Sequence, residues 1–261
     1  MLYLRSLLTN VFVYGTIALG CITSSIVGVF SRRAVNYMWD HMIMPPALFF
    51  MKIFGGIKIE YRGLENLRQK DVIYASKHES ALETYCFNTV INNIVFVLKK
   101  ELTYIPIFGW AQYFYGTIPV DRKAGGAAMR KMLHAAENMV KKGRPIMIFP
   151  EGTRCIPGTT KGYKAGPYLL AKQLKLPVIP VALNTGFFWA KNSFLRYSGT
   201  VVIEFMPPIS AEGKNSAEFM NELEGIIEGK CAELNLETAG KYEHAKKMLA
   251  NNKNLLTRNE R

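Results

Sequence analysis

The first 31 residues contain an unusually long apolar stretch. Residues 6–31 carry no charged side chain, and Arg32 and Arg33 follow them. As a helix this stretch would be about 39 Å long at 1.5 Å per residue, which exceeds the ~30 Å hydrocarbon core of a bilayer. The apolar part of a cleavable signal peptide is shorter, about 7–15 residues. We therefore expect residues 6–31 to form an uncleaved helix that inserts into a membrane.

A second apolar stretch, residues 42–57, is interrupted by Pro45, Pro46 and Lys52. It is too short and too broken for a confident membrane span. The pattern suits an interfacial helix, or the return arm of a hairpin that enters one leaflet. The alternative is a buried helix of a globular domain.

After Tyr61 the pattern changes to short apolar runs that alternate with amphipathic segments. β-branched runs edged by polar residues predict strands, at 71–77, 93–100, 116–120, 145–149, 178–183 and 200–205. Apolar positions at helical spacing predict helices, at 127–142, 166–174 and 216–234. Such alternation predicts an α/β fold, a layered, mostly parallel or mixed sheet flanked by helices.

The same patterns divide the chain into three parts. We expect N-terminal hydrophobic membrane-anchoring helices in residues 1–58 and a catalytic α/β domain in residues 59–240. Residues 241–261 are polar, and we expect a loosely held tail there.

Charge limits the classes of partner. The chain has 33 Lys and Arg against 20 Asp and Glu, a formal net charge of +13. This excess favours an anionic partner. The basic residues are spread along the chain, with no zinc-finger spacing, RNP-like aromatic motif or Arg-rich run, so we expect a phospholipid membrane and no nucleic acid.

The four cysteines are far apart and show no CxxC spacing, which argues against a disulfide framework and fits a reducing compartment. No cluster of His, Cys and Asp has the spacing of metal ligands, so we expect neither a metal nor a bound cofactor.

Candidate chemistry begins at His78, directly after the strand predicted for residues 71–77, where α/β folds place reactive groups. The pattern Ser80-x-x-Glu83 predicts a capping box with the helix start at Ser80. His78 then precedes the helix and Glu83 lies in its first turn, so the two side chains can meet. Glu83 has two compatible interpretations: a helix cap that accepts the Ser80 N–H, and a partner of the imidazole.

Such a pair suits acyl transfer to an alcohol. The hydroxyl loses its proton as the new C–O bond forms, and a neutral His accepts a proton near pH 7. A carboxylate on the other ring nitrogen fixes the tautomer and stabilises the imidazolium. A single His is more often structural, so a catalytic role for this pair needs support from other parts of the sequence.

Cations gather near other predicted strand ends, which favours a shared anion pocket. The strand predicted for residues 145–149 runs into Pro150-Glu151-Gly152-Thr153-Arg154, in which a glycine, a hydroxyl and a guanidinium match phosphate. Other basic residues near strand ends are Lys99, Lys100, Arg122, Lys161 and Lys164. Taken singly, each is more often a solvated surface charge. Glu151 has two interpretations, a partner of Arg122 or an acceptor for a glycerol hydroxyl.

Four blocks in order resemble the glycerolipid acyltransferase family, and within it the bacterial 1-acyl-sn-glycerol-3-phosphate acyltransferases. The blocks are His78-x4-Glu83, Ile118-Pro-Val-Asp-Arg122, Phe149-Pro-Glu-Gly-Thr-Arg154 and Leu176-Pro-Val-Ile-Pro180-Val. The resemblance covers about residues 60–210, and four blocks in order are far more specific than any one of them. Two positions depart from the common pattern: Glu83 stands where Asp is commonest, and Pro119 replaces an aromatic residue.

The resemblance implies roles for individual residues. His78 would be the general base, with Glu83 as its orienting partner. Substrate binding would fall to Lys100, Arg122, Glu151, Gly152, Thr153, Arg154 and Pro180, the last of these on the acyl side.

The resemblance also implies a reaction. A fatty acyl chain would pass from acyl-CoA or acyl-carrier protein to the 2-hydroxyl of 1-acyl-glycerol 3-phosphate (lysophosphatidate), giving phosphatidate. The expected location is the bacterial inner membrane, with the catalytic domain on the cytoplasmic side. One alternative is another acceptor within the superfamily, glycerol 3-phosphate or a lyso-aminolipid. The other is a non-catalytic membrane lipid-binding protein, against which the retained His78 and intact blocks argue.

Overall fold

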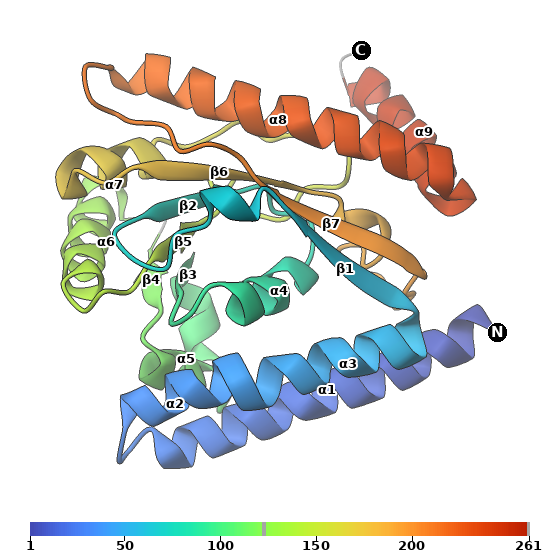
Figure 1. Ribbon diagram of the computed structural model, residues 1–261, viewed down its shortest axis with the longest axis horizontal. Helices are drawn as coiled ribbons and strands as arrows, with labels where there is room; N and C mark the ends of the chain where they lie inside the picture. Colours follow the sequence, from blue (N-terminus) through green and yellow to red (C-terminus); the bar gives the residue numbers. More distant parts are fainter. Residues whose placement is uncertain (122–123, 260–261) are drawn as a thin grey trace.

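A seven-stranded sheet forms the centre of the protein (Figure 1). The computed structural model describes residues 1–121 and 124–259, with residues 253–259 described by their backbone alone. The strands are β1 (Ile57–Arg62), β2 (Ile73–Ser76), β3 (Val95–Lys99), β4 (Ile118–Val120), β5 (Ile146–Ile148), β6 (Val178–Leu183) and β7 (Gly199–Phe205). Their order in the sheet is β1-β7-β6-β2-β5-β3-β4. Every neighbouring pair is parallel except β6 with β7, so the predicted mixed α/β sheet is confirmed.

Helices cover both faces of this sheet. They are α1 (Leu2–Val27), α2 (Arg32–Met38), α3 (Met44–Gly55), α4 (Leu82–Val90), α5 (Phe108–Tyr115), α6 (Gly125–Val140), α7 (Gly166–Leu174), α8 (Ser216–Lys241) and α9 (Glu243–Asn259). Short helical turns occur at Trp39–Ile43, Leu64–Asn66, Lys100–Tyr104 and Thr185–Phe187. The strands and helices predicted beyond Tyr61 are all present, most with ends shifted by a few residues.

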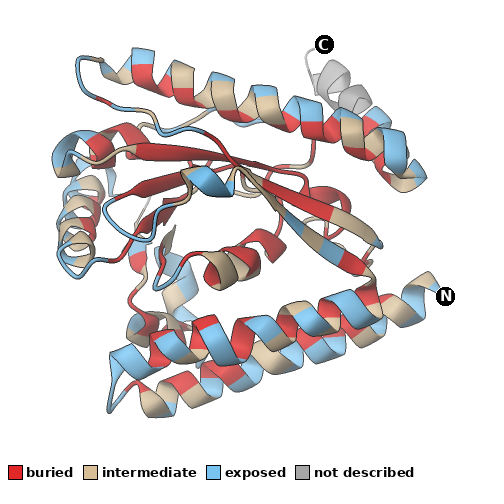
Figure 2. Ribbon diagram, in the orientation of Figure 1, coloured by how far each residue is buried: buried red, intermediate tan, exposed pale blue. Residues whose placement is uncertain are grey.

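The core has two parts because side chains alternate between the faces of a strand. Tyr74 of β2 points to the side that holds α1, α3 and α4, whereas its neighbours Ile73 and Ala75 point to the side that holds α6, α7 and α8. All three side chains are fully buried. In Figure 2 the central strands are buried along most of their length, as expected for a sheet covered on both faces.

The two apolar N-terminal stretches form a helical hairpin. Helix α3 runs back along α1, and the Arg5 guanidinium donates to the carbonyl of Gly55 at 2.9 Å, which fastens the start of α1 to the end of α3 (Figure 1). Val13 of α1 and Met51 of α3 are buried in the same core cluster as the sheet residues. The N-terminal residues therefore form a hairpin that packs on the α/β domain.

Helix α1 contacts the α/β domain near both of its ends. Near the start, the Arg196 N–H donates to Ser6 Oγ and the Asn10 amide donates to the Phe194 carbonyl, each at 2.9 Å. Near the other end, Gly28 lies against the Phe114 ring of α5, so closely that an added Cβ would be 2.2 Å from it. The helix thus lies along the flank of the domain.

The C-terminal tail differs from the loosely held segment that its polar sequence predicts. It forms α9, in which Ala245 and Leu249 are buried at helical spacing. The Asn252 amide donates to the Pro157 carbonyl at 2.9 Å. These contacts fasten the tail to the rest of the chain up to residue 252, so that expectation is wrong.

Candidate active site

The carboxyl ends of the central parallel strands bring the candidate residues together. Strands β2 and β5 pair in parallel, so the segments that follow them leave the sheet at the same edge. The backbone N–H of Cys155 donates to the carbonyl of His78 at 2.8 Å. The loop of residues 150–155 therefore lies directly beside His78.

His78 and Glu83 form a hydrogen-bonded pair. His78 Nδ1 lies 2.8 Å from Glu83 Oε1, with the Glu83 side chain fully buried and the imidazole 18% exposed. Glu83 also accepts hydrogen bonds from the backbone N–H groups of Glu79 and Ser80 and from the Thr185 hydroxyl. An ionised carboxylate can only accept hydrogen bonds, so Nδ1 of His78 carries a proton and donates a hydrogen bond to Glu83. The neutral imidazole then presents Nε2 as an acceptor, which has no hydrogen-bond partner among the described residues.

Only half of the predicted capping box is present, and it coexists with the imidazole contact of Glu83. Glu83 Oε1 accepts the Ser80 N–H at 2.8 Å, as a capping box requires. In a full capping box the Ser80 hydroxyl would accept from the N–H of Glu83. Here it accepts from the N–H of Leu82, the first residue of α4. The helix therefore starts two residues later than predicted, which leaves the chain from His78 to Ala81 free to wrap around the carboxylate.

The plane of the imidazole is fixed by Phe149. The two rings stack with centroids 4.0 Å apart and an interplanar angle of 22°. Phe149 follows β5, so its position depends on the same strand pairing that places the loop of residues 150–155. Packing and the Glu83 hydrogen bond together hold His78 in one orientation at the cavity wall.

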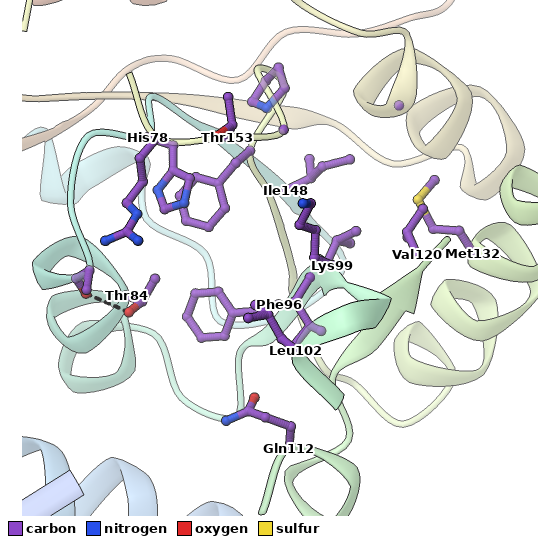
Figure 3. Close-up of a pocket in the computed structure, with 18 of the residues that line it drawn as sticks. His78, Thr84, Phe96, Lys99, Leu102, Gln112, Val120, Met132, Ile148 and Thr153 are labelled. Atoms are coloured by element: carbon purple, nitrogen blue, oxygen red, sulfur yellow. Dashed lines mark hydrogen bonds between the residues drawn. The ribbon is translucent and has the colours of Figure 1, made fainter. Parts of the chain in front are cut away.

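A cavity of about 680 Å³ opens in front of His78. Figure 3 shows His78 and Thr153 on one side, Phe96 and Leu102 near the centre and Gln112 toward the N-terminal helices. Apolar lining residues include Ile17, Met44, Phe96, Leu102, Met132 and Ile148. The size is typical of a ligand site, and the apolar walls suit a hydrocarbon chain.

Cationic residues line the cavity beside this apolar region. They are Lys99, Arg154, Lys164 and Lys191, with Asp121 as the acidic lining residue. Gly152 and Thr153 also line the wall, and Gly152 has a φ of +67°, a conformation that favours glycine. The Lys191 ammonium donates to the Arg154 carbonyl at 3.0 Å and so fastens the loop that carries the guanidinium. The arrangement suits an anionic group next to an apolar chain.

The structure places three of the other predicted site residues, Lys100, Glu151 and Pro180, outside the cavity lining. Lys100 is exposed and its ammonium lies 3.3 Å from Asp121. Glu151 is buried and pairs with Lys77 at 2.8 Å. Pro180 is buried within β6, opposite Ala75 of β2. Arg122 lies outside the described residues.

Sequence reasoning missed several residues of the site. Thr185 carries no motif, because its contact with Glu83 depends on the fold of a distant segment. Lys191 lies in the segment between β6 and β7, beyond the helical turn Thr185–Phe187, where no strand end marks it in the sequence. Glu79 is also unforeseen: burial raises the pKa of its carboxyl to about 8, although the Lys77 charge and the Gly186 N–H oppose the shift.

Comparisons with known proteins agree with this geometry. The sequence model of a family described as Acyltransferase matches residues 58–184. The chain is 35% identical over 191 residues to a 1-acyl-sn-glycerol-3-phosphate acyltransferase from Pseudomonas aeruginosa, covering 72% of this chain and 74% of the relative. The chain belongs to the acyltransferase family. A relative from Saccharomyces cerevisiae with the same name is 29% identical over 216 residues, 80% of this chain and 70% of the relative.

A solved structure of an acyltransferase has the same fold. The crystal structure of the 1-acyl-sn-glycerophosphate (LPA) acyltransferase PlsC from Thermotoga maritima matches with a TM-score of 0.71 at 21% sequence identity. The match covers 90% of this chain and 98% of that chain. This acyltransferase therefore shares the overall fold of that protein.

Proposed function

We propose that this acyltransferase moves a fatty acyl chain from a thioester, acyl-CoA or acyl-carrier protein, to the 2-hydroxyl of 1-acyl-glycerol 3-phosphate. The products are phosphatidate and a free thiol. The observation that carries the proposal is the His78–Glu83 pair, which faces a cavity with apolar walls and a cationic lining. The cations suit the phosphate, and the walls suit the acyl chains. The names of the relatives from Pseudomonas aeruginosa and Saccharomyces cerevisiae support the same acceptor.

The proposed mechanism uses His78 as general base and then as general acid. Its free Nε2 takes the proton of the acceptor hydroxyl while the hydroxyl oxygen attacks the thioester carbonyl. Glu83, 2.8 Å from Nδ1, stabilises the imidazolium that results. When the tetrahedral intermediate collapses, the C–S bond breaks and the thiolate takes the proton from His78. The pair is then ready for the next turnover.

The loop after β5 is the proposed phosphate site. Arg154 supplies a planar guanidinium, Thr153 a hydroxyl, and Gly152 lets the backbone come close to the ligand. The family resemblance adds Arg122 on the acceptor side. Among the described residues, the Arg154 guanidinium makes no hydrogen bond or ion pair, so it is available to an anionic ligand.

We also propose that the protein lies on a membrane, with α1 in the plane of the interface. Helix α1 is long and apolar enough to cross a bilayer, and 22% of its most apolar window is buried. Its contacts with the α/β domain near both ends support docking in preference to crossing. The exposed apolar side chains that would meet lipid include Leu4, Leu19, Ile22 and Ile26 of α1, and Trp110 and Tyr113 of α5. Because both thioester donors are cytoplasmic, the proposed location is the cytoplasmic side of a bacterial inner membrane.

One assay tests the reaction. The purified protein in detergent is offered lysophosphatidate, glycerol 3-phosphate or a lyso-aminolipid, each with acyl-CoA and with acyl-carrier protein. The proposal predicts phosphatidate from lysophosphatidate and no comparable product from the other two acceptors. Faster turnover of another acceptor would contradict the proposed substrate. No product from any pair, with the fold intact, would contradict the reaction itself.

A further inference from the structure

A buried lysine lies directly before His78. Lys77 is 1% exposed and is the only lysine among the buried residues that the structure describes. Its ammonium donates to Glu151 Oε1 at 2.8 Å, to the Thr159 carbonyl at 2.7 Å and to Glu228 Oε1 at 2.8 Å. These contacts use all three ammonium protons. The side chain therefore has a complete set of acceptors inside the protein, and it is not among the residues that line the cavity.

The charge of Lys77 is maintained by its two carboxylates. Burial by itself lowers the pKa of the ammonium, but the charges of Glu151 and Glu228 outweigh burial and raise the pKa above its ordinary value. A buried ion pair with satisfied hydrogen bonds is strongly disrupted when one partner is removed, because the other charge is left unpaired. Lys77 and Glu151 therefore act as one unit.

This unit joins the two parts of the active site. Glu151 Oε2 accepts the backbone N–H of His78 at 3.3 Å, while Oε1 binds Lys77. Glu151 directly precedes Gly152, at the start of the loop that carries Arg154. Thr159, whose carbonyl accepts from Lys77, lies further along the same chain segment. The backbone that carries the base and the loop that faces the acceptor are thus fastened to the same two charges.

We propose that Lys77 is a positioning residue that holds the imidazole of His78 at a fixed position relative to the loop of Gly152–Arg154. The inference rests on the proposed function and deepens it. It also gives Glu151 a role as the anchor of both segments, because its two oxygens are used by Lys77 and by the His78 backbone. Helix α8 contributes through Glu228, which also accepts from the Tyr163 hydroxyl at 2.7 Å.

A rival explanation is that the pair only neutralises buried charge. The two explanations differ for the double substitution Lys77→Met with Glu151→Met, which replaces the pair by apolar side chains. Such replacements of buried ion pairs often keep or increase stability. If the pair only compensates charge, the double variant recovers both its melting temperature and its activity. If the pair positions the site, the melting temperature recovers and the activity does not.

The experiment measures melting temperature, kcat and the KM of acceptor and donor for Lys77→Met, Glu151→Gln and the double variant. The control is Lys141→Met, which removes an exposed lysine paired with Glu137 on α6. The acceptor is the one that wild-type protein uses fastest in the acceptor panel, so a wrong acceptor assignment and a wrong positioning role are separated. We expect the control to match wild type.

For the double variant we expect a melting temperature near that of wild type and a kcat/KM for the acceptor lower by on the order of 10²-fold, as small misplacements of reacting groups produce. Glu151→Gln keeps the volume and leaves Lys77 paired with Glu228, so it should fold even if the double variant does not. It should raise the acceptor KM and lower kcat while the donor KM stays near wild type. Wild-type kinetics in Glu151→Gln, or recovered kinetics in the double variant, would overturn the proposal.

Discussion

The Thr185 hydroxyl donates to Glu83 Oε2 at 2.8 Å, although the two residues are 102 positions apart in the chain. Thr185 follows β6 and Glu83 lies in the first turn of α4, next to β2. The hydrogen bond therefore exists only when β6 and β2 pair in register. It fixes the carboxylate oxygen that His78 does not use, so Glu83 cannot rotate away from the imidazole.

The substitution Thr185→Val tests this support of the carboxylate. Valine keeps the shape of threonine and removes the hydroxyl donor to Glu83. Hydrogen bonds to charged groups contribute about 1.5–3 kcal/mol, and we expect part of this to appear as a kcat lower by about tenfold. Steady-state kinetics at saturating substrates measure it. An unchanged kcat would show that the backbone N–H groups of Glu79 and Ser80 hold Glu83 without Thr185.

Arg154→Ala should weaken binding of the acceptor. The guanidinium faces the cavity beside Thr153, and loss of a charge-assisted contact with phosphate costs about 1.5–3 kcal/mol. We expect the acceptor KM to rise by about 10–100-fold and the thioester KM to change little. Kinetics with each substrate varied in turn measure both constants. Equal damage to both substrates would mean that Arg154 has a structural role.

Exposed apolar residues of α1 should control attachment to membranes. Ile22 and Ile26 are 46% and 61% exposed, whereas Leu236 on α8 is 67% exposed and lies away from the hairpin. Replacing both isoleucines by Asn should lower binding to anionic phospholipid vesicles by about tenfold or more, given roughly 25 cal/mol per Å² of apolar area. The control, Leu236→Gln, should bind as wild type does. Sedimentation with vesicles at high salt measures this, and equal loss in both variants would contradict the assigned face.

The raised pKa of Glu79 predicts that the stability of the protein depends on pH. Burial raises the pKa of its carboxyl from 4.5 to about 8, so the folded state holds a proton that the unfolded state releases. Between these values the folded state binds more protons, and its free energy of unfolding must fall as pH rises. Burial also raises the pKa of Asp40, to about 6, and lowers the pKa of His244, so both groups contribute near pH 6 and a variant of Glu79 is needed to assign the slope.

The substitution Glu79→Gln removes this titration. The variant should show a flatter dependence of unfolding free energy on pH between 6 and 8, and it should gain stability relative to wild type at pH 8, by at least ~1 kcal/mol. Urea denaturation at several pH values measures the difference. Parallel curves for the two proteins would show that Glu79 does not bind this proton.

The elements that the sequence predicted are those with buried, regular patterns. Residues 178–183 are six buried apolar residues or prolines in a row, and they form β6 with the predicted bounds. Strand β1 was not predicted, although Ile57, Ile59 and Tyr61 alternate with charged residues, because it begins directly after the apolar helix α3. The tail was misjudged because Ala245 and Leu249 are the only buried apolar residues of α9 up to residue 252, too few for a periodic signal.

The residues of the site also divide into those that the sequence predicted and those that it did not. His78 and the loop of residues 150–154 were found because each follows a strand predicted from its own sequence, and parallel strands end at the same edge. The contacts of Thr185 with Glu83, and of Lys77 with Glu151 and Glu228, link segments far apart in the chain. Such contacts depend on the order of strands in the sheet and on where α8 crosses it, which local patterns do not specify.

The central claim is that His78 and Glu83 act as one catalytic unit. Glu83→Gln keeps the size of the side chain and an acceptor for the Ser80 N–H, so the start of α4 and the melting temperature should be retained. It removes the charge that stabilises the imidazolium, and the amide can bind the wrong tautomer of His78. In enzymes with a Ser-His-Asp triad the comparable change lowers turnover by about 10⁴.

The most direct measurement is kcat for Glu83→Gln, His78→Ala and the double variant, at saturating acceptor and donor. The account predicts that Glu83→Gln lowers kcat by at least about 10²-fold with little change in acceptor KM. His78→Ala should be as low or lower, and the double variant little lower than His78→Ala, as for residues that act together. Turnover near wild type in Glu83→Gln would leave Glu83 as a helix cap, and substantial turnover in His78→Ala would contradict the mechanism.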